Sequence, residues 1–292
     1  MAKYDYNSAS PFSLLILLGI VWGSSFILIA HILPCYTPIQ YALLRVMLTG
    51  LCLSPWCIKY IKTVNKTQLL WLFSLGALGY FISYLFMGIS QKHISSSLAG
   101  ILSSLAPLFT FILGTIFFKH EFKWKNIFGI SLGLIGCLFI VLFRKSGNTV
   151  TEETYYMYFM FVSVLSSAIA LNISQSKLKG IPPLAIASVS FGTAGILAMI
   201  GFLSITDWSA LTMHSQIVSC TASLLCLSII GTALASLVYF HIMKITNALY
   251  TSTVTYIIPI VAVLWGLTAN EQVSSNQIIG LGLIIGGIRL LR

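Results

Sequence analysis

The chain has 292 residues, of which 58% are hydrophobic and only 8% are charged. A soluble globular protein has about 25% charged residues, so this chain has too few charges to cover a surface that faces water. The composition excludes a soluble protein and predicts an all-α integral membrane protein. Each spanning helix takes about 20 residues, so ten such helices leave no room for a separate soluble domain.

The net charge of +10 arises from 16 Lys and Arg residues against 6 Asp and Glu residues. The basic residues do not form one patch. They lie singly or in threes between apolar runs, as is typical of cytoplasmic loops. We therefore expect no nucleic-acid partner. The expected partners are the lipid bilayer and a small-molecule substrate, and the sequence leaves the oligomeric state open, a monomer included.

Apolar runs recur at near-regular intervals, with short polar segments between them. The first run, 11–33, is too long for the apolar region of a signal peptide, so we expect a spanning helix and no cleaved signal. In chain order, the runs predict helices over 11–33, 38–58, 68–90, 94–118, 125–143, 155–175, 183–204, 216–241, 247–268 and 276–291.

The Lys and Arg residues between these helices predict the orientation of the chain. If the N-terminus is cytoplasmic, only Lys92, Arg144 and Lys145 fall outside. Twelve others fall inside, namely Lys3, Lys59, Lys62, Lys66, Lys119, Lys123, Lys125, Lys177, Lys179, Lys244, Arg289 and Arg292. Cytoplasmic loops carry the excess of Lys and Arg, so the N-terminus is predicted to be cytoplasmic. The even number of helices then places the C-terminus there too.

The second half of the chain repeats features of the first half in the same order. In each half, a helix with a central proline precedes a lone glutamate and a glycine-rich last helix. The matching residues are Pro38, Gly50, Pro107, Glu121, Gly129 and Gly136 in the first half, and Pro183, Gly195, Pro259, Glu271, Gly280 and Gly287 in the second. The sequence predicts two repeats of five helices, 1–143 and 154–292. Because five is odd, the two repeats have inverted topology, as in many transporters.

These features resemble the EamA family of the drug/metabolite transporter (DMT) superfamily. The likeness rests on WGSSF at Trp22–Phe26 in the first helix and on the doubled pattern of proline, glutamate and glycines. Arg45 also lies where that family often has an arginine. The resemblance implies a multi-pass carrier of the bacterial inner membrane for amino acids or related small metabolites, often an exporter. The second half has Ser167–Ala170 in place of the Trp22–Ser25 segment, which predicts an asymmetric cavity.

Small and polar residues form a stripe along two of the predicted helices. They are Ser96, Gly100, Ser103, Pro107, Thr110 and Gly114 in the fourth helix, and Ala248, Ser252, Thr255, Pro259, Ala262 and Gly266 in the ninth. Steps of three and four keep one face of a helix. This face either packs against another helix through small residues or lines a transport pathway, and both can hold along different parts. Ser103, Ser104, Thr255 and Tyr256 are the expected lining residues.

Arg45 is the one charged residue within a predicted helix interior. It can extend toward water, bond carbonyls near Pro107, or bind a substrate carboxylate with its planar fork. Aromatic rings inside spans, Trp22 and Tyr84 above all, either pack in the core or face a substrate. Asn172 either bonds a neighbouring helix or contacts substrate. The candidate substrate-binding residues are Trp22, Ser25, Arg45, Tyr84, Ser103, Pro107, Asn172, Thr255, Tyr256 and Pro259.

The six cysteines show neither C-x-x-C nor Cys/His spacing, and five lie in apolar segments, so we expect small buried hydrophobes rather than disulfides or zinc ligands. No metal or cofactor is expected. No acid lies at the middle of a span, and Glu121 and Glu271 are expected to be structural.

The leading function is a secondary transporter that works by alternating access, in the direction of export. The alternative is an uptake carrier or exchanger for a nucleoside-type metabolite such as S-adenosylmethionine. A membrane-embedded enzyme would need paired acids, a metal cluster or a nucleophile–base pair at membrane depth. The acids are too scattered for this, and the chain has no G-x-S-x-G, H-E-x-x-H or P-loop motif, so an enzyme is not expected. A channel ranks third, because nothing resembles a filter loop.

Overall fold

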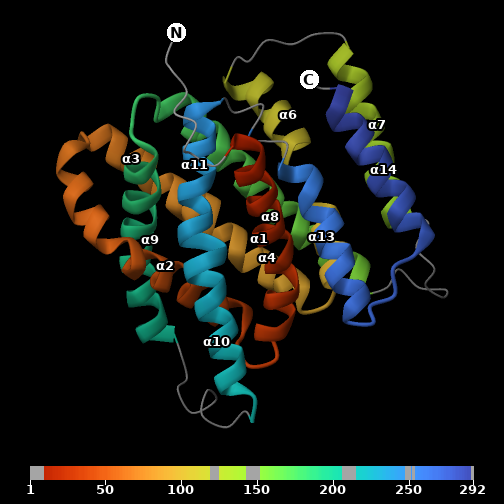
Figure 1. Ribbon diagram of the computed structural model, residues 1–292, viewed down its shortest axis with the longest axis horizontal. Coiled ribbons are helices and arrows are strands. Elements are labelled where there is room, and N and C mark those ends of the chain that lie inside the picture. The colour runs from red at the N-terminus through yellow and green to blue at the C-terminus, as the bar shows by residue number, and fades with distance from the viewer. Residues whose placement is uncertain are drawn as a thin grey trace.

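The computed structural model describes residues 10–118, 125–142, 152–205, 215–246, 251 and 254–290. Every regular element in these ranges is helical, and none of them contains a strand (Figure 1). Within these ranges, seven helical segments are long and apolar enough to cross a membrane: Pro11–Ile32, Pro38–Thr63, Lys66–Gln91, Ser96–Phe118, Thr154–Lys177, Pro183–Ser204 and Ile217–Ile245. The chain is therefore an all-helical, multi-pass membrane protein, as its composition predicts.

The helices of the first half begin and end close to the predicted positions. They are α1 (Pro11–Ile32), α2 (Pro38–Tyr60), η1 (Ile61–Thr63), α3 (Lys66–Leu75), η2 (Gly76–Ile82), α4 (Ser83–Gln91), α5 (Ser96–Ser103), α6 (Ala106–Phe118) and α7 (Lys125–Leu142). Reciprocal capping boxes define the starts of two of them, α2 and α3. The side chains of Thr37 and Asn65 each accept a hydrogen bond from the backbone N–H of the glutamine three residues later. The side-chain oxygen of that glutamine in turn accepts a hydrogen bond from the backbone N–H of the cap residue.

The second half consists of α8 (Glu152–Lys177), α9 (Pro183–Ile205), α10 (Ile217–Ser228), η4 (Ile229–Leu234), α11 (Ala235–Ile245), α13 (Val254–Thr268) and α14 (Ser275–Leu290). Two of the helical runs contain a wide π-helical segment, η2 between α3 and α4 and η4 between α10 and α11. Such segments are rare and are often found at functional sites. Hydrophobic periodicity did not predict them, because the apolar pattern continues through both.

The helix expected over 94–118 is broken into α5 and α6 at Ser104–Leu105. Pro107 explains the break, because it has no N–H for the carbonyl of Ser103 and its ring crowds that carbonyl. Nearby hydroxyls bond the carbonyls around the break. Ser103 donates to the carbonyl of Gly100 at 2.6 Å, and Thr110 to that of Ala106 at 2.8 Å.

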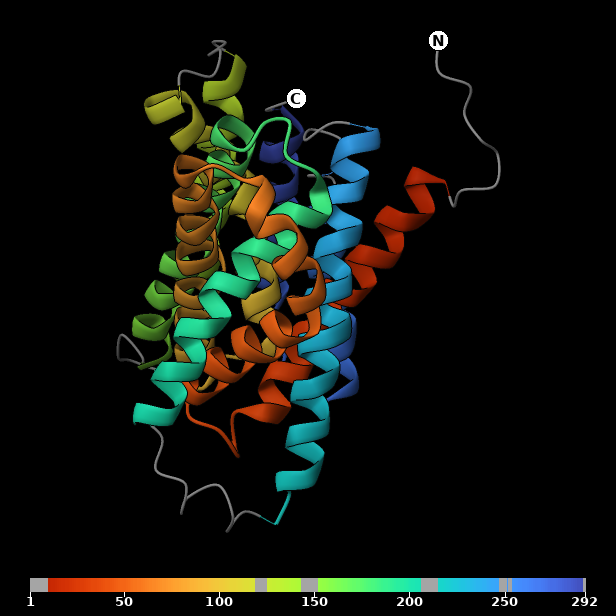
Figure 2. The same ribbon diagram turned by 90° about the vertical axis from the view of Figure 1, so that its left-hand side faces the viewer.

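Helices from the two halves pack against each other. The most extensive contacts join α2 to α9, α7 to α14, and α1 to α13 (Figures 1 and 2). Aligned glycines lie at two of these crossings. A Cβ atom on Gly50 would lie 2.7 Å from the carbonyl oxygen of Phe191 and 3.2 Å from the Cα of Gly195. One on Gly287 would lie 2.6 Å from the carbonyl oxygen of Gly129. Small residues allow this close backbone approach.

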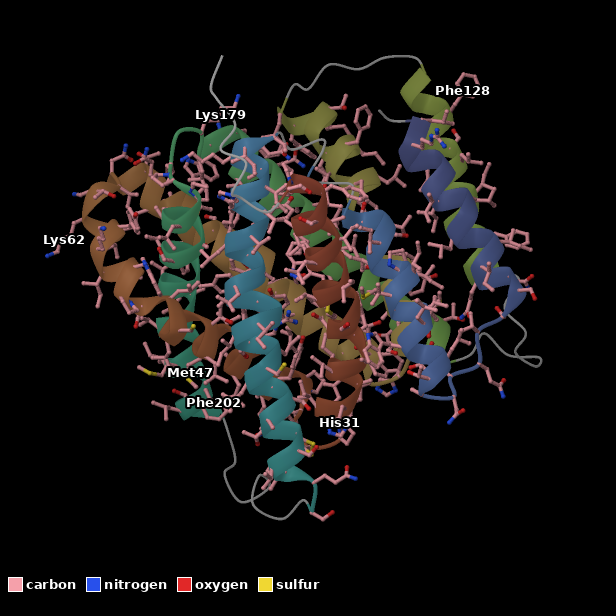
Figure 3. The ribbon with its side chains drawn as sticks, in the orientation of Figure 1. His31, Met47, Lys62, Phe128, Lys179 and Phe202 are labelled. Carbon is pink, nitrogen blue, oxygen red and sulfur yellow. A yellow bond between two sulfur atoms is a disulfide. The ribbon has the colours of Figure 1, made fainter. Side chains whose placement is uncertain are left out.

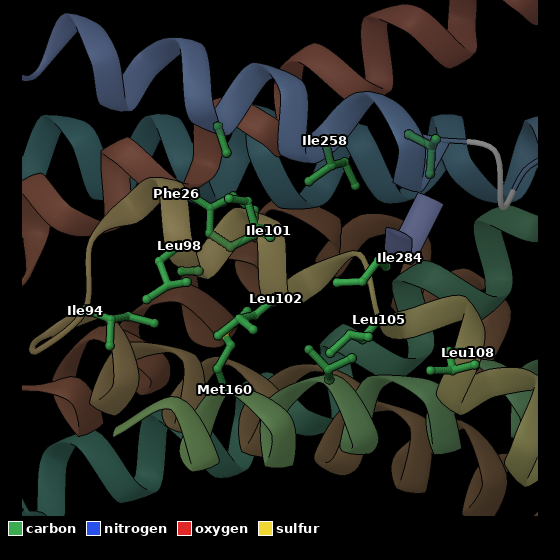
Figure 4. Close-up of a cluster of buried hydrophobic side chains, with 14 of the residues drawn as sticks. Phe26, Ile94, Leu98, Ile101, Leu102, Leu105, Leu108, Met160, Ile258 and Ile284 are labelled. Atoms are coloured by element: carbon green, nitrogen blue, oxygen red, sulfur yellow. The ribbon is translucent and has the colours of Figure 1, made fainter. Parts of the chain in front are cut away.

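The largest buried apolar cluster surrounds α5. Figure 4 shows Phe26 of α1 beside Ile101, and Leu102 pointing toward Met160 of α8. Ile258 of α13 belongs to the same cluster. Side chains from three other helices, and from both halves, thus fix the position of α5.

The structure contains a disulfide between Cys35, just after α1, and Cys220 in the first turn of α10. The prediction that the cysteines form no disulfide was therefore wrong for this pair. The two residues are 185 positions apart, so no local spacing reveals them, and only the packing of α1 on α10 brings them together. Close to the disulfide, the hydroxyl groups of Tyr36 and Thr221 form a hydrogen bond of 2.7 Å between the same two segments. Cys52, Cys57 and Cys226 are free thiols.

The helix bundle has two distinct ends. The start of α1 and the end of α14 lie at the same end, uppermost in Figures 1 and 2. Lys179, between α8 and α9, also lies there, whereas His31 and Phe202 lie at the opposite end (Figure 3). Cys35 follows shortly after His31, so the disulfide belongs to the lower end of the bundle.

Candidate substrate-binding cavity

A cavity of about 560 Å³ lies between helices of both halves. Pockets for small molecules usually have volumes of about 300–1,000 Å³, so this cavity is large enough for a metabolite. Its wall comes from α1, α2, α3, η2, α4, α5, α6, α8, α11 and α13. The wall is mostly apolar and aromatic, with hydroxyl groups and one guanidinium.

Seven of the ten candidate residues line this cavity: Trp22, Ser25, Arg45, Tyr84, Ser103, Pro107 and Thr255. Pro259 is buried in α13 and does not line it. Asn172 does not line it either. The side chain of Tyr256 lies outside the described part of the structure.

Asn172 connects two helices. Its side chain is fully buried, and its amide donates to the carbonyl of Thr110 on α6 and to that of Ala168 on α8, both at 3.0 Å. The sequence left open whether Asn172 bonds a neighbouring helix or contacts substrate. The geometry shows the interhelical bond, and Asn172 is not among the residues that line the cavity.

Some parts of the two small-residue stripes pack against another helix, and other parts line the cavity. Where Gly100 faces Ala262 and where Gly266 faces Ser97, no space is left for a larger side chain, so these parts pack helix against helix. The central part is open, because Ser103, Pro107, Thr110 and Thr255 line the cavity. Ser104, an expected lining residue, is instead buried and donates to the carbonyl of Ile101 at 2.6 Å. Ala248 and Ser252 lie outside the described residues.

Arg45 is only 4% exposed and lines the cavity from α2. Its Nε donates to the hydroxyl of Thr232 in η4 at 3.0 Å, and its Nη1 donates to the hydroxyl of Tyr41 at 2.6 Å. The ring of Tyr84 covers one face of the guanidinium, with Cζ 3.7 Å from the ring centroid. Arg45 therefore neither extends to bulk water nor bonds carbonyls near Pro107, the two structural roles that the sequence left open.

No acidic side chain is described near Arg45. Glu271 is the one acid whose side chain the structure describes, and it is bonded to Ser96 and Ser97 instead. In the described part of the chain, the positive charge of Arg45 is thus balanced only by hydroxyl dipoles and an aromatic face.

Aromatic rings form a large part of the wall and are held in place. The indole N–H of Trp22 donates to the carbonyl of Gly231 in η4 at 3.2 Å, and the ring lies 5.2 Å from that of Tyr239. Tyr80 stacks on Phe191, with centroids 3.7 Å apart, and lies 6.2 Å from Tyr84. Phe26, Phe111 and Phe240 also line the cavity, and the sequence did not single them out.

A hydroxyl face on α8 was not predicted from the sequence. Ser163, Ser167 and Ser174 line the cavity, and the hydroxyl of Ser83 bonds those of Ser163 and Ser167 at 3.1 and 2.7 Å. A signal was present, because steps of four and seven residues keep one face of a helix. This face lies where the second half departs from the WGSS pattern.

Comparison with known proteins identifies the family. The model of the EamA-like transporter family matches residues 10–142 and 154–292. The chain belongs to the EamA-like transporter family. The resemblance to this family in the sequence is thereby confirmed, and this EamA-like protein is a membrane transporter.

Relatives of this EamA-like transporter match it over nearly their whole length. An "Uncharacterized transporter" of Archaeoglobus fulgidus is 24% identical over 92% of this chain and 94% of its own. "Uncharacterized inner membrane transporter YedA" of Escherichia coli is 21% identical over 96% of this chain and 90% of its own. "Protein PecM" of Dickeya dadantii is 23% identical over 93% of this chain and 89% of its own.

A solved crystal structure has the same fold. It is 17% identical in sequence, with a TM-score of 0.65 over 97% of this chain and 96% of its own.

Proposed function

We propose that this EamA-like transporter is a secondary carrier of the bacterial inner membrane that exports amino acids or related small metabolites by alternating access. The observation that carries the proposal is the cavity of about 560 Å³, whose wall comes from helices of both halves. A site between two halves can face either side of the membrane in turn when the halves rearrange.

The proposed architecture has ten spanning helices in two inverted repeats, 1–143 and 154–292. The packing of matching helices supports it, since α2 packs on α9 and α7 on α14. The π-helical segments support it too. Gly76–Ile82 lies in the third helix of the first half, and Ile229–Leu234 in the third helix of the second.

We also propose that both termini are cytoplasmic. The twelve-to-three distribution of Lys and Arg supports this, and so does the disulfide at the end of the bundle opposite to Lys179, because disulfides persist in oxidising compartments outside the cytoplasm. Reporter fusions after Lys66, Lys179 and Arg292 should report the cytoplasm, and fusions after Ser146 and Trp208 the outer side. A C-terminus on the outer side would contradict both the ten helices and the inverted repeat.

A nucleoside-type metabolite is the second candidate substrate, carried by uptake or exchange. The aromatic wall favours it, because Trp22, Tyr80 and Tyr239 offer flat faces for stacking. The cavity is also larger than most amino acids need. Both candidates agree with a carrier that acts as a monomer in the lipid bilayer and needs no cofactor.

Transport by the purified protein tests the proposal. A thermal-shift screen of amino acids and nucleoside-type metabolites selects ligands, which are then tested for counterflow in proteoliposomes. We expect flux that saturates and is driven by unlabelled ligand on the opposite side. Flux that rises linearly with concentration would indicate a channel, and absence of flux for every ligand in the screen would contradict the proposed substrate classes.

Two variants control for the role of the cavity. Ser103→Trp places a large ring in the cavity and should abolish counterflow, whereas Ser204→Trp adds the same ring on an exposed position of α9 and should not. The direction follows from comparing everted and right-side-out vesicles, in which an exporter accumulates substrate only in the everted form.

A further inference from the structure

We propose, resting on the proposed transport function, that Arg45 is an anion-binding site, so that this carrier takes substrates combining a carboxylate with a flat ring and discriminates against cations. The proposal joins two observations. These are the guanidinium in the cavity wall, with no described acid to neutralise it, and the fixed aromatic wall.

The first observation concerns the unused donors of Arg45. A guanidinium has five N–H donors. In the described part of the chain, Nε bonds Thr232 and Nη1 bonds Tyr41, while Nη2 has no hydrogen bond. The side chain nevertheless lines the cavity. A buried charge with free donors is stabilised by an anion that enters the cavity, and a carboxylate matches the planar donor fork.

The guanidinium is held ready for such an anion. Tyr41 and Thr232 fix two of its nitrogens from α2 and η4, and Tyr84 fixes its plane from α4. A group already held in its binding geometry loses little conformational entropy when the ligand binds. Thr232 can take this position because its own hydroxyl bonds the carbonyl of Leu227 at 2.9 Å within the wide turn of η4.

The second observation concerns the ring of the substrate. Trp22 is fixed by its bond to Gly231, Tyr239 lies beside it, and Tyr80 is stacked on Phe191. Such rings bind flat apolar groups. Aromatic faces also attract cations. However, no acid is among the described residues that line the cavity, and Arg45 repels a cation that enters it.

Binding of four matched probes to the wild-type protein in nanodiscs tests this proposal. Indole-3-acetate has a ring and a carboxylate, indole-3-acetamide has the same shape without charge, tryptamine is the cationic relative, and acetate has no ring. We expect indole-3-acetate to bind at least about tenfold more tightly than each of the others, the effect of one charge-assisted hydrogen bond. Equal binding of the acid and the amide, or tightest binding of tryptamine, would overturn the proposal.

Two variants assign the selectivity to Arg45. Arg45→Lys keeps the charge but loses the planar fork, so the ratio between acid and amide should fall at least about fivefold. Lys59→Gln removes an exposed positive charge from α2 and should leave the ratio unchanged. A ratio that Arg45→Lys leaves unchanged would also overturn the assignment. If Arg45→Lys does not fold, the comparison of probes on the wild-type protein still decides.

The counterflow assay separates this proposal from the proposed function. Saturable counterflow of neutral or cationic ligands, with no preference for carboxylates, would overturn the anion site and leave the carrier function standing. Absence of binding by all four probes would likewise overturn the proposed substrate class, while counterflow of other metabolites would still support a carrier.

Discussion

The carboxylate of Glu271 accepts two hydrogen bonds from Ser96, one from its backbone N–H at 2.9 Å and one from its hydroxyl at 2.6 Å. Ser97 donates the same two groups to the other carboxylate oxygen. Glu271 follows α13 in the second half and caps the start of α5 in the first, where free N–H groups and the helix dipole favour a negative charge. Glu271 therefore has the structural role that its position in the sequence predicted.

Replacing this carboxylate should destabilise the protein. Glu271→Gln keeps the shape but removes the charge and replaces one acceptor oxygen with a donor, so one serine loses its bonds. We expect a loss of about 1–3 kcal/mol in the free energy of unfolding, measured as a lower melting temperature in detergent. Gln272→Ala, at the exposed neighbouring position, should be neutral. Equal melting temperatures for wild type and Glu271→Gln would contradict the capping role.

The same contact predicts a dependence on pH. Burial favours the neutral form of Glu271, but the bonds from Ser96 and Ser97 outweigh it and lower the pKa of this carboxyl below its ordinary value of 4.5. A lowered pKa in the folded state means that the stabilisation is complete above pH 4.5 and is lost as the pH falls through the folded-state value. The difference in melting temperature between wild type and Glu271→Gln should therefore be constant near neutral pH and shrink below pH 4.5. A difference independent of pH would mean that the charge contributes nothing.

The crossing of α2 and α9 should not tolerate a side chain at Gly50. A Cβ atom there would lie 2.7 Å from the carbonyl oxygen of Phe191, so the helices must separate. We expect Gly50→Ala to cost about 1–3 kcal/mol. Gly282→Ala is the matched control, because nothing lies within 4 Å of a Cβ atom at that position. Thermal unfolding of both variants in one detergent checks the difference, and equal stability would show that α2 and α9 adjust without cost.

The disulfide should be detectable by counting thiols. After denaturation, a polyethylene-glycol maleimide should modify two more cysteines in the reduced protein than in the untreated protein, because Cys35 and Cys220 become free. Removing the bond with Cys35→Ser should lower the stability by about 2–4 kcal/mol, the usual effect of a disulfide. Cys226→Ser, at a free and exposed thiol, is the control. The same number of modified thiols before and after reduction would exclude the bond.

The sequence predicted the helices and their approximate ends because apolar runs and the short polar segments between them are local signals. It also predicted the family and most of the candidate site, since Trp22, Arg45 and Tyr84 are unusual residues inside apolar spans. Partners that are distant in the chain could not be predicted. The bond from Arg45 to Thr232 spans 187 positions and depends on the π-helical turn of η4, which leaves no mark in the hydrophobic pattern.

Asn172 is a second residue whose partner could not be predicted from the sequence. A polar amide inside a span is equally suited to a substrate and to a neighbouring helix, and only the packing of α8 on α6 assigns it to the carbonyl of Thr110. Local sequence gives the chemical type of a group, and tertiary packing decides what it faces.

The last prediction rests on the difference between two adjacent serines at the end of α5, one that lines the cavity and one that is buried against protein. Ser103 lines the cavity, whereas the adjacent Ser104 is 1% exposed and does not. In an active cysteine-free background, Ser103→Cys and Thr255→Cys should react with a small water-soluble methanethiosulfonate reagent, and Ser104→Cys should react at least about tenfold more slowly, since burial limits access. Bound substrate should protect Ser103→Cys and Thr255→Cys. Equal rates at Ser103 and Ser104, or protection of neither lining position, would mean that this face of α5 packs against protein and that the substrate binds elsewhere.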